Sequence, residues 1–300
     1  MKLGIGIDLG GTTIKGAAFD LATGKLLGKD TLPTWSEDDD KDSPGFVARV
    51  AELVEGLEEQ QGESAGVLGI SAPGLAARDS LRIDFMPGRL EALEGLEWGQ
   101  VLGRDARVLN DAHAALMGEV WQGAARRLQD VFLLTLGTGV GGAVLSDGKL
   151  LQGHLGRAGH LGHIALDFHG AGDICGTPGS LEEKVGNYSV GDRSDGRFDS
   201  THALVEAMHS GDEEAAEIWE ESMKALAAGV ASLVNVLDPE VVLIGGGISQ
   251  AWEDIEKPLA TYLDSFEWRP GGHAVEVRRA ALGEWAGTYG AVYFAMQQTT

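Results

Sequence analysis

The stretch that decides the fold is Gly4-Ile5-Gly6-Ile7-Asp8-Leu9-Gly10-Gly11-Thr12-Thr13, and it has an echo in the middle of the chain. The echo reads Leu133-Leu134-Thr135-Leu136-Gly137-Thr138-Gly139-Val140-Gly141-Gly142. In each stretch an apolar strand runs into a glycine and threonine turn, and a second strand follows. Such a turn lets backbone N–H groups approach an anion, because glycine has no Cβ and allows a positive φ. The repetition predicts two similar lobes that grip one polyphosphate.

Each turn lies within a predicted meander of three strands. The first meander covers Leu3 to Leu9, Ile14 to Phe19 and Lys25 to Leu32, and the second covers Val131 to Leu136, Gly142 to Leu145 and Lys149 to Gln152. Between them we expect an acidic loop from Ser36 to Asp42, a helix from Phe46, a strand from Val67 to Ile70 that ends in Ala72-Pro73-Gly74, and a helix from Ala112 to Gln122. We place the change of lobe near Asp111.

After the second meander, residues 153–200 are rich in Gly, His and Asp and are predicted to form loops that support a site. A long helix with one apolar face from Ala215 to Leu237 ends at Asp238-Pro239. Next come a buried strand from Val241 to Ile244, the turn Gly245-Gly246-Gly247, which suits a nucleotide, a helix through Phe266 and a last helix from Ala286 to Gln297. We therefore expect an α/β fold with a mixed sheet flanked by helices in each lobe. The N-terminal lobe is predicted to hold residues 1–111 and 286–300, and the C-terminal lobe residues 112–285.

Composition narrows the class of partner. The chain of 300 residues is long enough for two modest domains, and its 46 acidic and 23 basic residues give a formal charge of −23. That charge repels nucleic acid and anionic membranes, so we expect neither as a partner. The single cysteine, Cys175, excludes an intrachain disulfide framework and fits a reducing compartment. No apolar run is long enough to span a bilayer and the first strand is no signal peptide, so we expect a cytoplasmic protein.

The polar residue of the opening stretch has two interpretations. Asp8 ends a buried strand, where a carboxylate is costly unless a cation or a hydrogen-bond donor meets it. Magnesium carried by ATP would meet that need through water, whereas the alternative is an aspartate that caps the turn. Alone, the turn Gly10-Gly11-Thr12 is best read as a tight hairpin. Together with Gly137-Thr138-Gly139 it favours phosphate binding. We call these the first and second phosphate turns.

The pair Asn110-Asp111 precedes a predicted helix at the expected lobe boundary. From spacing alone, Asp111 is best read as the N-cap of that helix. The functional alternative is a general base that takes the proton of an attacking hydroxyl, which requires an acceptor carboxylate aimed into a cleft.

Four motifs in order give the chain a resemblance to the ROK family of bacterial sugar kinases. Asp8-Leu9-Gly10-Gly11-Thr12 resembles the first phosphate motif of the family and Leu109-Asn110-Asp111-Ala112-His113-Ala114-Ala115 its catalytic motif. Leu136-Gly137-Thr138-Gly139-Val140-Gly141-Gly142 resembles the second phosphate motif, and the segment from Leu237 to Gly247 resembles the adenosine-side motif. The resemblance covers nearly the whole chain. It implies a two-lobed, actin-like (RNase H-like) ATPase fold.

The resemblance also implies roles for particular residues. Asp111 would be the base that deprotonates a sugar hydroxyl, Asn110 would bond neighbouring hydroxyls, and Gly74 would also lie on the sugar side. The cofactors would be ATP and Mg²⁺, and the reaction would be in-line transfer of the γ-phosphoryl group. The ATP-binding residues would be Asp8, Gly10, Gly11, Thr12, Gly137, Thr138, Gly139, Gly245, Gly246 and Gly247, with Asp8 holding Mg²⁺ through water. The family commonly dimerises, so the resemblance implies a homodimer.

This chain departs from the family pattern in the segment that faces the sugar. The family usually has Gly-Glu-x-Gly-His, whereas this chain has Gly159-His160-Leu161-Gly162-His163. A carboxylate accepts two or more hydroxyl bonds, but a neutral imidazole offers one donor and one acceptor. We keep His160, His163 and Glu182 as sugar-binding candidates, against the alternative that His160 is a surface histidine. Before the catalytic motif, a Pro-Asn-Leu-like segment is also altered, because Gly88 follows Pro87. The preferred sugar and its phosphorylated hydroxyl are not predicted.

The second departure concerns a metal. The resemblance implies a structural zinc held by the motif histidine and by a Cys-x-Cys-Gly-x-x-Gly-Cys-x-Glu segment. Here that segment reads Asp173-Ile174-Cys175-Gly176-Thr177-Pro178-Gly179-Ser180-Leu181-Glu182, so two of three thiolates are missing. His163 and Cys175 provide only two of the four ligands that structural zinc requires. We expect no structural zinc, although Asp173, His160 or His169 would be candidates to complete another site.

Two alternatives to an ATP-dependent sugar kinase stay open at this point. The departures motivate a sugar-binding sensor or regulator with the same fold and little phosphoryl transfer. A polymerising scaffold of the actin type is less favoured, because it leaves the sugar-facing segment unexplained. Some family members are repressors with an N-terminal DNA-binding module, but we expect none before a first strand that starts at Lys2 or Leu3.

Overall fold

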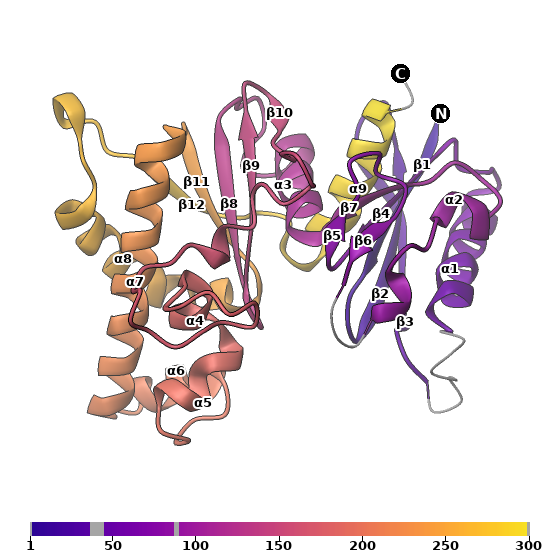
Figure 1. Ribbon diagram of the computed structural model, residues 1–300. Helices are drawn as coiled ribbons and strands as arrows, with labels where there is room; N and C mark the ends of the chain where they lie inside the picture. Colours follow the sequence, from indigo (N-terminus) through magenta and orange to yellow (C-terminus); the bar gives the residue numbers. More distant parts are fainter. Residues whose placement is uncertain (1, 37–44, 87–89, 299–300) are drawn as a thin grey trace. The chain divides into compact units, whose positions relative to one another are not determined.

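The computed structural model describes residues 2–36, 45–86 and 90–298, and it divides into two compact units. Unit 1 comprises residues 1–127, 152–158 and 281–300, and unit 2 comprises residues 128–151 and 159–280 (Figure 1). Most of the predicted acidic loop, and the altered Pro87-Gly88, lie outside the described residues. None of the described helices is both long enough and apolar enough to cross a membrane.

Unit 1 is built on a five-stranded sheet in the order β3-β2-β1-β4-β7. β1 pairs antiparallel with β2 and parallel with β4, β2 pairs antiparallel with β3, and β4 pairs parallel with β7. Its strands are β1 (Leu3–Leu9), β2 (Thr13–Asp20), β3 (Lys25–Pro33), β4 (Val67–Ala72) and β7 (Arg107–Asn110), and a separate hairpin pairs β5 (Leu75–Ala76) with β6 (Ile83–Phe85). Its helices are α1 (Phe46–Gln61), α2 (Trp98–Val101), α3 (Asp111–Gln122) and α9 (Ala286–Gln298).

The alternation of glycine and isoleucine in β1 explains how helices cover both faces of this sheet. Ile5 and Ile7 are fully buried in the core that α1 closes. On the opposite face, a Cβ at Gly6 would lie 1.9 Å from the carbonyl oxygen of Thr288, and one at Gly69 of β4 would lie 2.0 Å from that of Ala291. The glycines therefore let the backbone of α9 lie directly on the sheet.

Unit 2 repeats this topology. Its sheet has the order β10-β9-β8-β11-β12, and the antiparallel and parallel pairings occur in the same sequence as in unit 1. Its strands are β8 (Val131–Leu136), β9 (Val140–Ser146), β10 (Lys149–Leu150), β11 (Val241–Gly245) and β12 (Glu276–Arg279). Its helices are α4 (Leu181–Val185), α5 (Val190–Arg193), α6 (Thr201–His209), α7 (Glu213–Leu237) and α8 (Trp252–Phe266). The echo in the sequence thus corresponds to two sheets with one connectivity.

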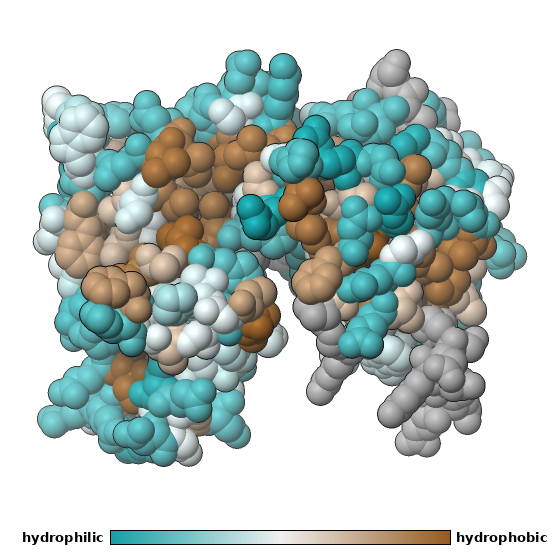
Figure 2. All heavy atoms as spheres, viewed as in Figure 1, coloured by the Kyte–Doolittle hydropathy of each residue, from teal (hydrophilic) through white to brown (hydrophobic). Residues whose placement is uncertain are grey.

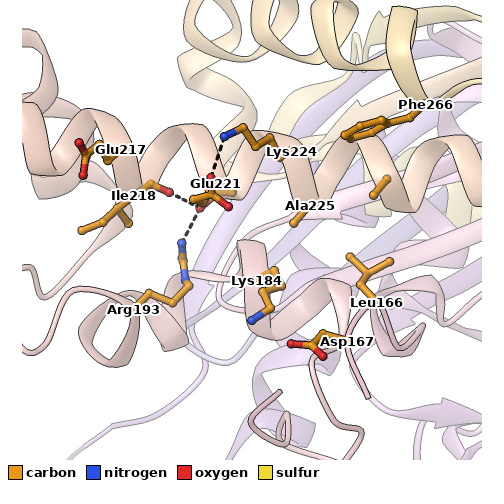
Figure 3. A pocket seen from close by; sticks show the side chains of 12 residues that line it. Leu166, Asp167, Lys184, Arg193, Glu217, Ile218, Glu221, Lys224, Ala225 and Phe266 are labelled. Carbon is orange, nitrogen blue, oxygen red and sulfur yellow. Dashed lines mark hydrogen bonds and ion pairs between the residues drawn. The ribbon is translucent and has the colours of Figure 1, made fainter. Parts of the chain in front are cut away.

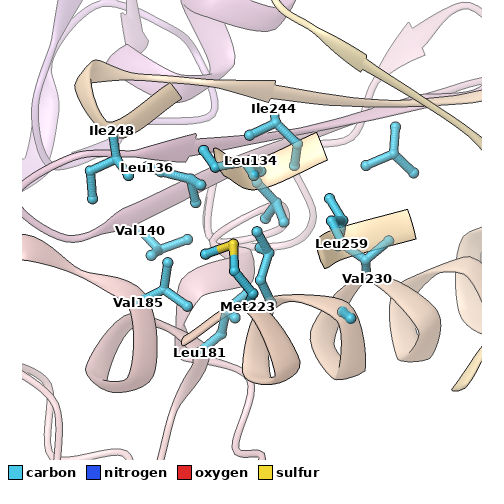
Figure 4. Close-up of a cluster of buried hydrophobic side chains, with 14 of the residues drawn as sticks. Leu134, Leu136, Val140, Leu181, Val185, Met223, Val230, Ile244, Ile248 and Leu259 are labelled. Carbon is cyan, nitrogen blue, oxygen red and sulfur yellow. The ribbon is translucent and has the colours of Figure 1, made fainter. Parts of the chain in front are cut away.

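The core of unit 2 lies between its sheet and the helices α7 and α8 (Figure 4). Met223 and Val230 of α7 are buried against strand residues such as Leu134 and Ile244. Short α4 is anchored in the same cluster. This packing gives rigid support to the residues that follow the strands.

The division between the units differs from the predicted lobe boundary at Asp111. Helix α3 belongs to unit 1, because it packs closely against α9: a Cβ at Gly290 would lie 1.6 Å from the carbonyl oxygen of Ala114, and one at Gly118 would lie 2.4 Å from that of Ala286. The chain leaves unit 1 after Arg127 and returns to it for residues 152–158. The predicted return of the last helix to the first part of the chain agrees with the structure.

Candidate active site

The predicted site residues of unit 1 follow the carboxyl ends of three parallel neighbouring strands. Asp8 lies at the end of β1, Gly74 follows β4, and Asn110 ends β7. Loops at the carboxyl ends of parallel strands are the usual place for ligands in α/β sheets. The fold therefore gathers residues that are far apart in sequence onto one edge of the sheet.

Asp8 has a partner that the sequence analysis missed. The hydroxyl of Ser71 donates a 2.6 Å hydrogen bond to Oδ1 of Asp8, and Ser71 is fully buried. The two residues are register partners on the parallel strands β1 and β4. The sequence shows a polar residue near the end of each of these buried strands. It does not show the strand register that places Ser71 beside Asp8. Gly287 of α9 completes the socket, because a Cβ there would lie 2.6 Å from Cγ of Asp8.

The pKa of Asp8 is raised to about 6, chiefly by burial and also by the charge of Asp111, against the opposing effects of Ser71 and Lys15. Two carboxylates in one low-dielectric environment disfavour each other's charged form. Among the described residues, Oδ2 of Asp8 accepts no hydrogen bond. A hard cation that prefers oxygen ligands, such as Mg²⁺, would relieve both effects, so this donor fits the predicted metal.

Asn110, and not Asp111, is the N-cap of α3. Its Oδ1 accepts hydrogen bonds from the backbone N–H groups of Ala112 at 3.0 Å and His113 at 3.3 Å, and its Nδ2 donates to the carbonyl oxygen of Gly74 at 3.0 Å. The preference from spacing for Asp111 as the cap is therefore wrong. The Asn110 side chain also hydrogen-bonds the carboxylate of Asp111 and so lowers the pKa of that carboxyl group against the effect of burial. Gly74 has a structural reason of its own, because its φ is +99° and its carbonyl positions Asn110.

Asp111 is the first residue of α3 and its side chain remains accessible. Its Oδ1 accepts a 2.8 Å hydrogen bond from the N–H of Ala112. Protein atoms crowd the carboxyl group even so, and this desolvation raises the pKa of Asp111 against the hydrogen bonds that lower it. An accessible carboxylate with a raised pKa has the properties of a general base.

The first phosphate turn has its carbonyl groups engaged and its N–H groups exposed. The hydroxyl of Thr34 donates to the carbonyl oxygen of Gly10 at 2.6 Å, and the indole N–H of Trp35 donates to that of Gly11 at 3.1 Å. Within the described part of the chain, the N–H groups of Gly11 and Thr12 have no hydrogen-bond partner. They are available to an anion.

The second phosphate turn in unit 2 is held in the same way. The carbonyl oxygens of Gly137 and Thr138 accept hydrogen bonds of 3.0 and 2.9 Å from the N–H groups of Asn187 and Tyr188. The N–H groups of Thr138 and Gly139 have no partner within residues 2–36, 45–86 and 90–298. Gly247 begins the short helix after the third glycine turn.

One glycine in each turn lacks any reason from within the protein. Gly11, Gly137 and Gly247 do not have positive φ, and a Cβ on any of them would meet no atom of the described residues within 4 Å. The expectation that the phosphate turns exploit positive φ is wrong, because none of their four glycines adopts it. Open space at these positions would permit close approach by a ligand. By contrast, Gly246 has a φ of +84° and packs against the carbonyl of Leu136.

Glu182 connects the sugar-facing segment to the second phosphate turn. Its Oε2 accepts a 2.9 Å hydrogen bond from the N–H of Val140, and a Cβ at Gly139 would lie 2.2 Å from the same oxygen. Glu182 is 5% exposed, and its Oε1 has no partner among the described residues. Burial raises the pKa of Glu182. This buried oxygen beside the second phosphate turn is an unsatisfied hydrogen-bond acceptor among the described residues.

His160 and His163 lie in the same unit. His160 precedes the 3₁₀ turn Leu161–His163, which packs on β9 because a Cβ at Gly162 would lie 1.9 Å from the carbonyl oxygen of Val140. Nδ1 of His163 is 2.8 Å from Oδ2 of Asp173, and its Nε2 is 3.7 Å from Sγ of Cys175. The structure thus places both histidines in the segment that borders the second phosphate turn.

A separate cavity of about 720 Å³ lies in unit 2 beside α7, and its lining includes Lys184, Arg193, Glu221 and Phe266 (Figure 3). This lining, drawn from the described residues, contains none of the predicted site residues. The candidate site is therefore defined by the glycine turns and the carboxylates, and not by the size of a cavity.

Comparisons with known proteins agree with these features. The family model described as ROK family matches residues 4–298. The glucokinase of Thermotoga maritima is 33% identical over 314 residues, covering 96% of this chain and 95% of the relative. A ROK hexokinase from Thermus thermophilus superposes with a TM-score of 0.83 at 30% identity, covering 99% of each chain. A ROK family glucokinase from Streptomyces griseus, solved in complex with glucose and AMPPNP, has a TM-score of 0.80 at 30% identity and covers 98% of this chain and 99% of its own.

The orphaned N–H groups of the two turns, the accessible carboxylate of Asp111 and a family match over nearly the whole sequence lead to one assignment. Two sheets of equal connectivity account for the repetition of the opening stretch in the middle of the chain. Relatives of similar length share the fold. The chain belongs to the ROK family.

Proposed function

We propose that this protein transfers the γ-phosphoryl group of ATP to a hydroxyl group of a sugar, with Asp111 as the general base. The observation that carries the proposal is that Asn110 is the N-cap of α3, while the side chain of Asp111 is exposed. Because Asn110 caps α3, the carboxylate of Asp111 is accessible at the carboxyl end of β7. Its raised pKa brings it closer to the operating pH, which favours proton abstraction.

The remaining residues bind and orient the reactants. The N–H groups of Gly11, Thr12, Thr138 and Gly139 bind phosphate oxygens, and the carboxylate of Glu182 accepts a sugar hydroxyl. Asn110 bonds neighbouring sugar hydroxyls, and His160, His163 and Gly74 complete the sugar-binding set. Gly245, Gly246 and Gly247 belong to the adenosine side. In a loose phosphoryl-transfer transition state, such positioning supplies most of the catalysis.

Asp8 holds Mg²⁺ through water in this proposal. The support is its oxygen donor, its raised pKa and an Oδ2 without a hydrogen-bond partner in the described chain. When bound, the ion neutralises charge on the phosphates. Ser71 fixes the rotamer of Asp8, and Gly287 leaves room for the carboxylate.

We also propose a homodimer in the cytoplasm. The family resemblance supports the dimer, and unit 2 exposes large apolar side chains, including Phe168, Ile174 and Trp268, of the kind that interfaces cover. Figure 2 shows hydrophobic areas interrupting the hydrophilic surface on one face. The single exposed cysteine fits a reducing compartment. Light scattering coupled to gel filtration measures the mass directly, and a monomer at micromolar concentration contradicts the dimer.

The function is tested with a panel of aldoses, ketoses and N-acetyl sugars, each with ATP and Mg²⁺, by following ADP release. We expect sugar-dependent ADP release with at least one member. Relatives named as glucokinases make the sensor alternative less favoured. Tight sugar binding by calorimetry without ADP above background for any sugar would reinstate the sensor. ATP-dependent growth of particles in light scattering would favour the scaffold instead.

A further inference from the structure

The segment where the family resemblance implies zinc is held in another way in this chain. The four positions concerned are His163, Asp173, Cys175 and Ser180, and the structure gathers them into one cluster in unit 2. The cluster contains one thiol, one imidazole, one carboxylate and one hydroxyl. Its geometry decides whether a metal or hydrogen bonds hold it together.

Asp173 is the centre of this cluster. Its Oδ1 accepts hydrogen bonds from the N–H groups of Cys175 and Thr177, each at 2.9 Å, and its Oδ2 accepts from Nδ1 of His163 at 2.8 Å. The hydroxyl of Ser180 is a further hydrogen-bond partner of the carboxylate. The Asp173 side chain is fully buried. A buried carboxylate is stable only when it is satisfied in this way.

The same geometry removes the donors that zinc needs. Structural zinc takes four nitrogen or sulfur ligands in a tetrahedron. One ligand atom from each of His163, Asp173 and Cys175 lies within 4.8 Å of the others, so these three are close enough for a metal ion, but both oxygens of Asp173 already accept hydrogen bonds and only Sγ of Cys175 lies near the free Nε2 of His163. Ser180 is already the N-cap of α4, where its Oγ accepts the N–H of Glu183. Only Nε2 and one thiol remain, and the residues therefore do not fit zinc.

We propose that a metal-free set of hydrogen bonds centred on Asp173 replaces the zinc and holds residues 163–182 in this chain. A carboxylate only accepts hydrogen bonds, so Nδ1 of neutral His163 must carry the proton and Nε2 keeps its lone pair. The Asp173 carboxylate thus sets the tautomer of His163. Through Ser180 it also connects to the cap of α4, the helix that carries Glu182.

The connection matters because α4 is only five residues long and makes few hydrogen bonds of its own. Leu181 and Val185 anchor one side of it in the core of unit 2 (Figure 4). The Asp173 cluster holds the loop that leads into its other side. The inference depends on contacts within unit 2 and on the family assignment, and it does not require that the chain phosphorylates a sugar.

The first test measures metal. The wild-type chain is incubated with zinc, separated from free metal by gel filtration and analysed for zinc by mass spectrometry, and its Tm is measured with and without a strong chelator. We expect far less than stoichiometric zinc and no change in Tm. A chelator-sensitive Tm or stoichiometric zinc would overturn the proposal. The double variant Asp173→Cys with Ser180→Cys would have three thiols and one imidazole at the four positions. Stoichiometric zinc in this variant, but not in the wild type, would support the proposal.

The second test measures the hydrogen bonds and does not depend on whether the double variant folds. Asp173→Asn keeps the size of the side chain but loses the charge that His163 and two backbone N–H groups contact. We expect its Tm to fall by several degrees and the Nδ1–H proton resonance of His163 to shift or vanish. The matched control is Asp192→Asn, at an exposed aspartate of α5 in the same unit, with Tm unchanged. Equal Tm values for the two variants would refute the role of Asp173.

Discussion

At the scale of single residues, the carboxylate of Asp111 is available for the proposed role as a base because Asn110, and not Asp111, caps α3. Sequence spacing could not distinguish the two, since aspartate and asparagine are about equally good N-caps. The side-chain bonds of Asn110 to the N–H groups of Ala112 and His113 decide the question. Asp8 could be located from the pattern, but its bond to Ser71 depends on strand register, which one sequence does not display.

Asp111→Asn removes the carboxylate that we propose as the general base and keeps the size of the side chain. We expect kcat to fall about 100- to 10,000-fold, which is the usual contribution of general base catalysis, while the Kd for the sugar stays within about tenfold. Turnover measured by ADP release, with sugar affinity measured by calorimetry, separates the two effects. Unchanged turnover would remove Asp111 from the mechanism.

We expect Asp8→Asn to lower phosphoryl transfer and to raise the Tm by an amount that depends on pH. The folded-state pKa of Asp8 is about 6 and the ordinary value is 3.8, so the stability that its protonation contributes is full below the ordinary value and is lost as pH rises through the folded value. Near pH 8 the wild type carries a buried charge that asparagine lacks, so we expect the variant to have a Tm a few degrees higher.

Near pH 5 wild-type Asp8 is largely protonated and the difference in Tm should shrink. Phosphoryl transfer by the variant should fall at all pH values, because the oxygen donor for Mg²⁺ has lost its charge. Thermal melts of both proteins across this range are the measurement. A difference in Tm that does not vary with pH would mean that Asp8 is not desolvated as described.

At the scale of elements, each phosphate turn follows a strand and consists of glycine and threonine, so few side chain atoms surround its backbone N–H groups. Eight strands were predictable to within about two residues, because glycine or polar positions alternate with buried apolar ones in β1 and apolar runs mark β8 and β11, but β7, which carries Asn110, was not predicted. Short elements such as α2, α4 and β12 were not predicted, since four or five residues show no reliable period.

Gly11→Ala tests whether the first phosphate turn binds a ligand. A Cβ there meets no protein atom and the φ is not positive, so the Tm should stay within about a degree of wild type. The methyl group would nonetheless stand where phosphate approaches, and we expect the KM for ATP to rise about tenfold or more. Gly137→Ala should behave in the same way. An unchanged KM for both variants would leave these glycines without a ligand to explain them.

The contact between α3 and α9 sets the positions of the two carboxylates, because Asp111 begins α3 and Gly287 of α9 touches Asp8. Gly290→Ala would place a Cβ 1.6 Å from the carbonyl oxygen of Ala114. We expect a loss of about 1–3 kcal/mol in the free energy of unfolding, together with reduced kcat. Chemical denaturation monitored by fluorescence measures the former.

The control for this helix contact is Gly56→Ala in α1, where a Cβ meets nothing within 4 Å. In a helix interior this change should stabilise the protein by about 0.5–1 kcal/mol. If both variants shifted stability in the same direction, the close approach of α3 and α9 would not be a determinant of the fold.

At the scale of the whole molecule, the sequence predicted two related halves, and the structure contains two sheets of the same connectivity. The boundary predicted at Asp111 lies before α3, whereas unit 1 continues to Arg127. Small residues let α3 pack on α9, and this contact joins residues more than 160 positions apart in the chain. Contacts so distant in sequence leave no periodic signal. The identity of the residues around the sugar was predictable only through motifs, and their hydrogen bonds were not.

Ligand binding should be visible as stabilisation of the whole molecule. With AMPPNP and Mg²⁺ at about 100 times its Kd, mass action adds about 2.7 kcal/mol to the free energy of unfolding, and a sugar substrate should raise the Tm further. Differential scanning fluorimetry with each ligand alone and with both provides the measurement. A sugar of the panel that gives no ADP release serves as the control. A Tm that ignores the nucleotide would argue against ATP as the donor.

The glycine face of β1 also has a consequence for how the protein is made. Strands that begin at residue 3 lie bare on one side until residues 286–298 emerge from the ribosome and cover them. During synthesis at about 5–20 residues per second, the nascent chain therefore waits many seconds with an apolar surface that α9 covers in the folded protein. Chaperones that shield such surfaces should bind nascent chains that lack this helix and release them once it has been translated.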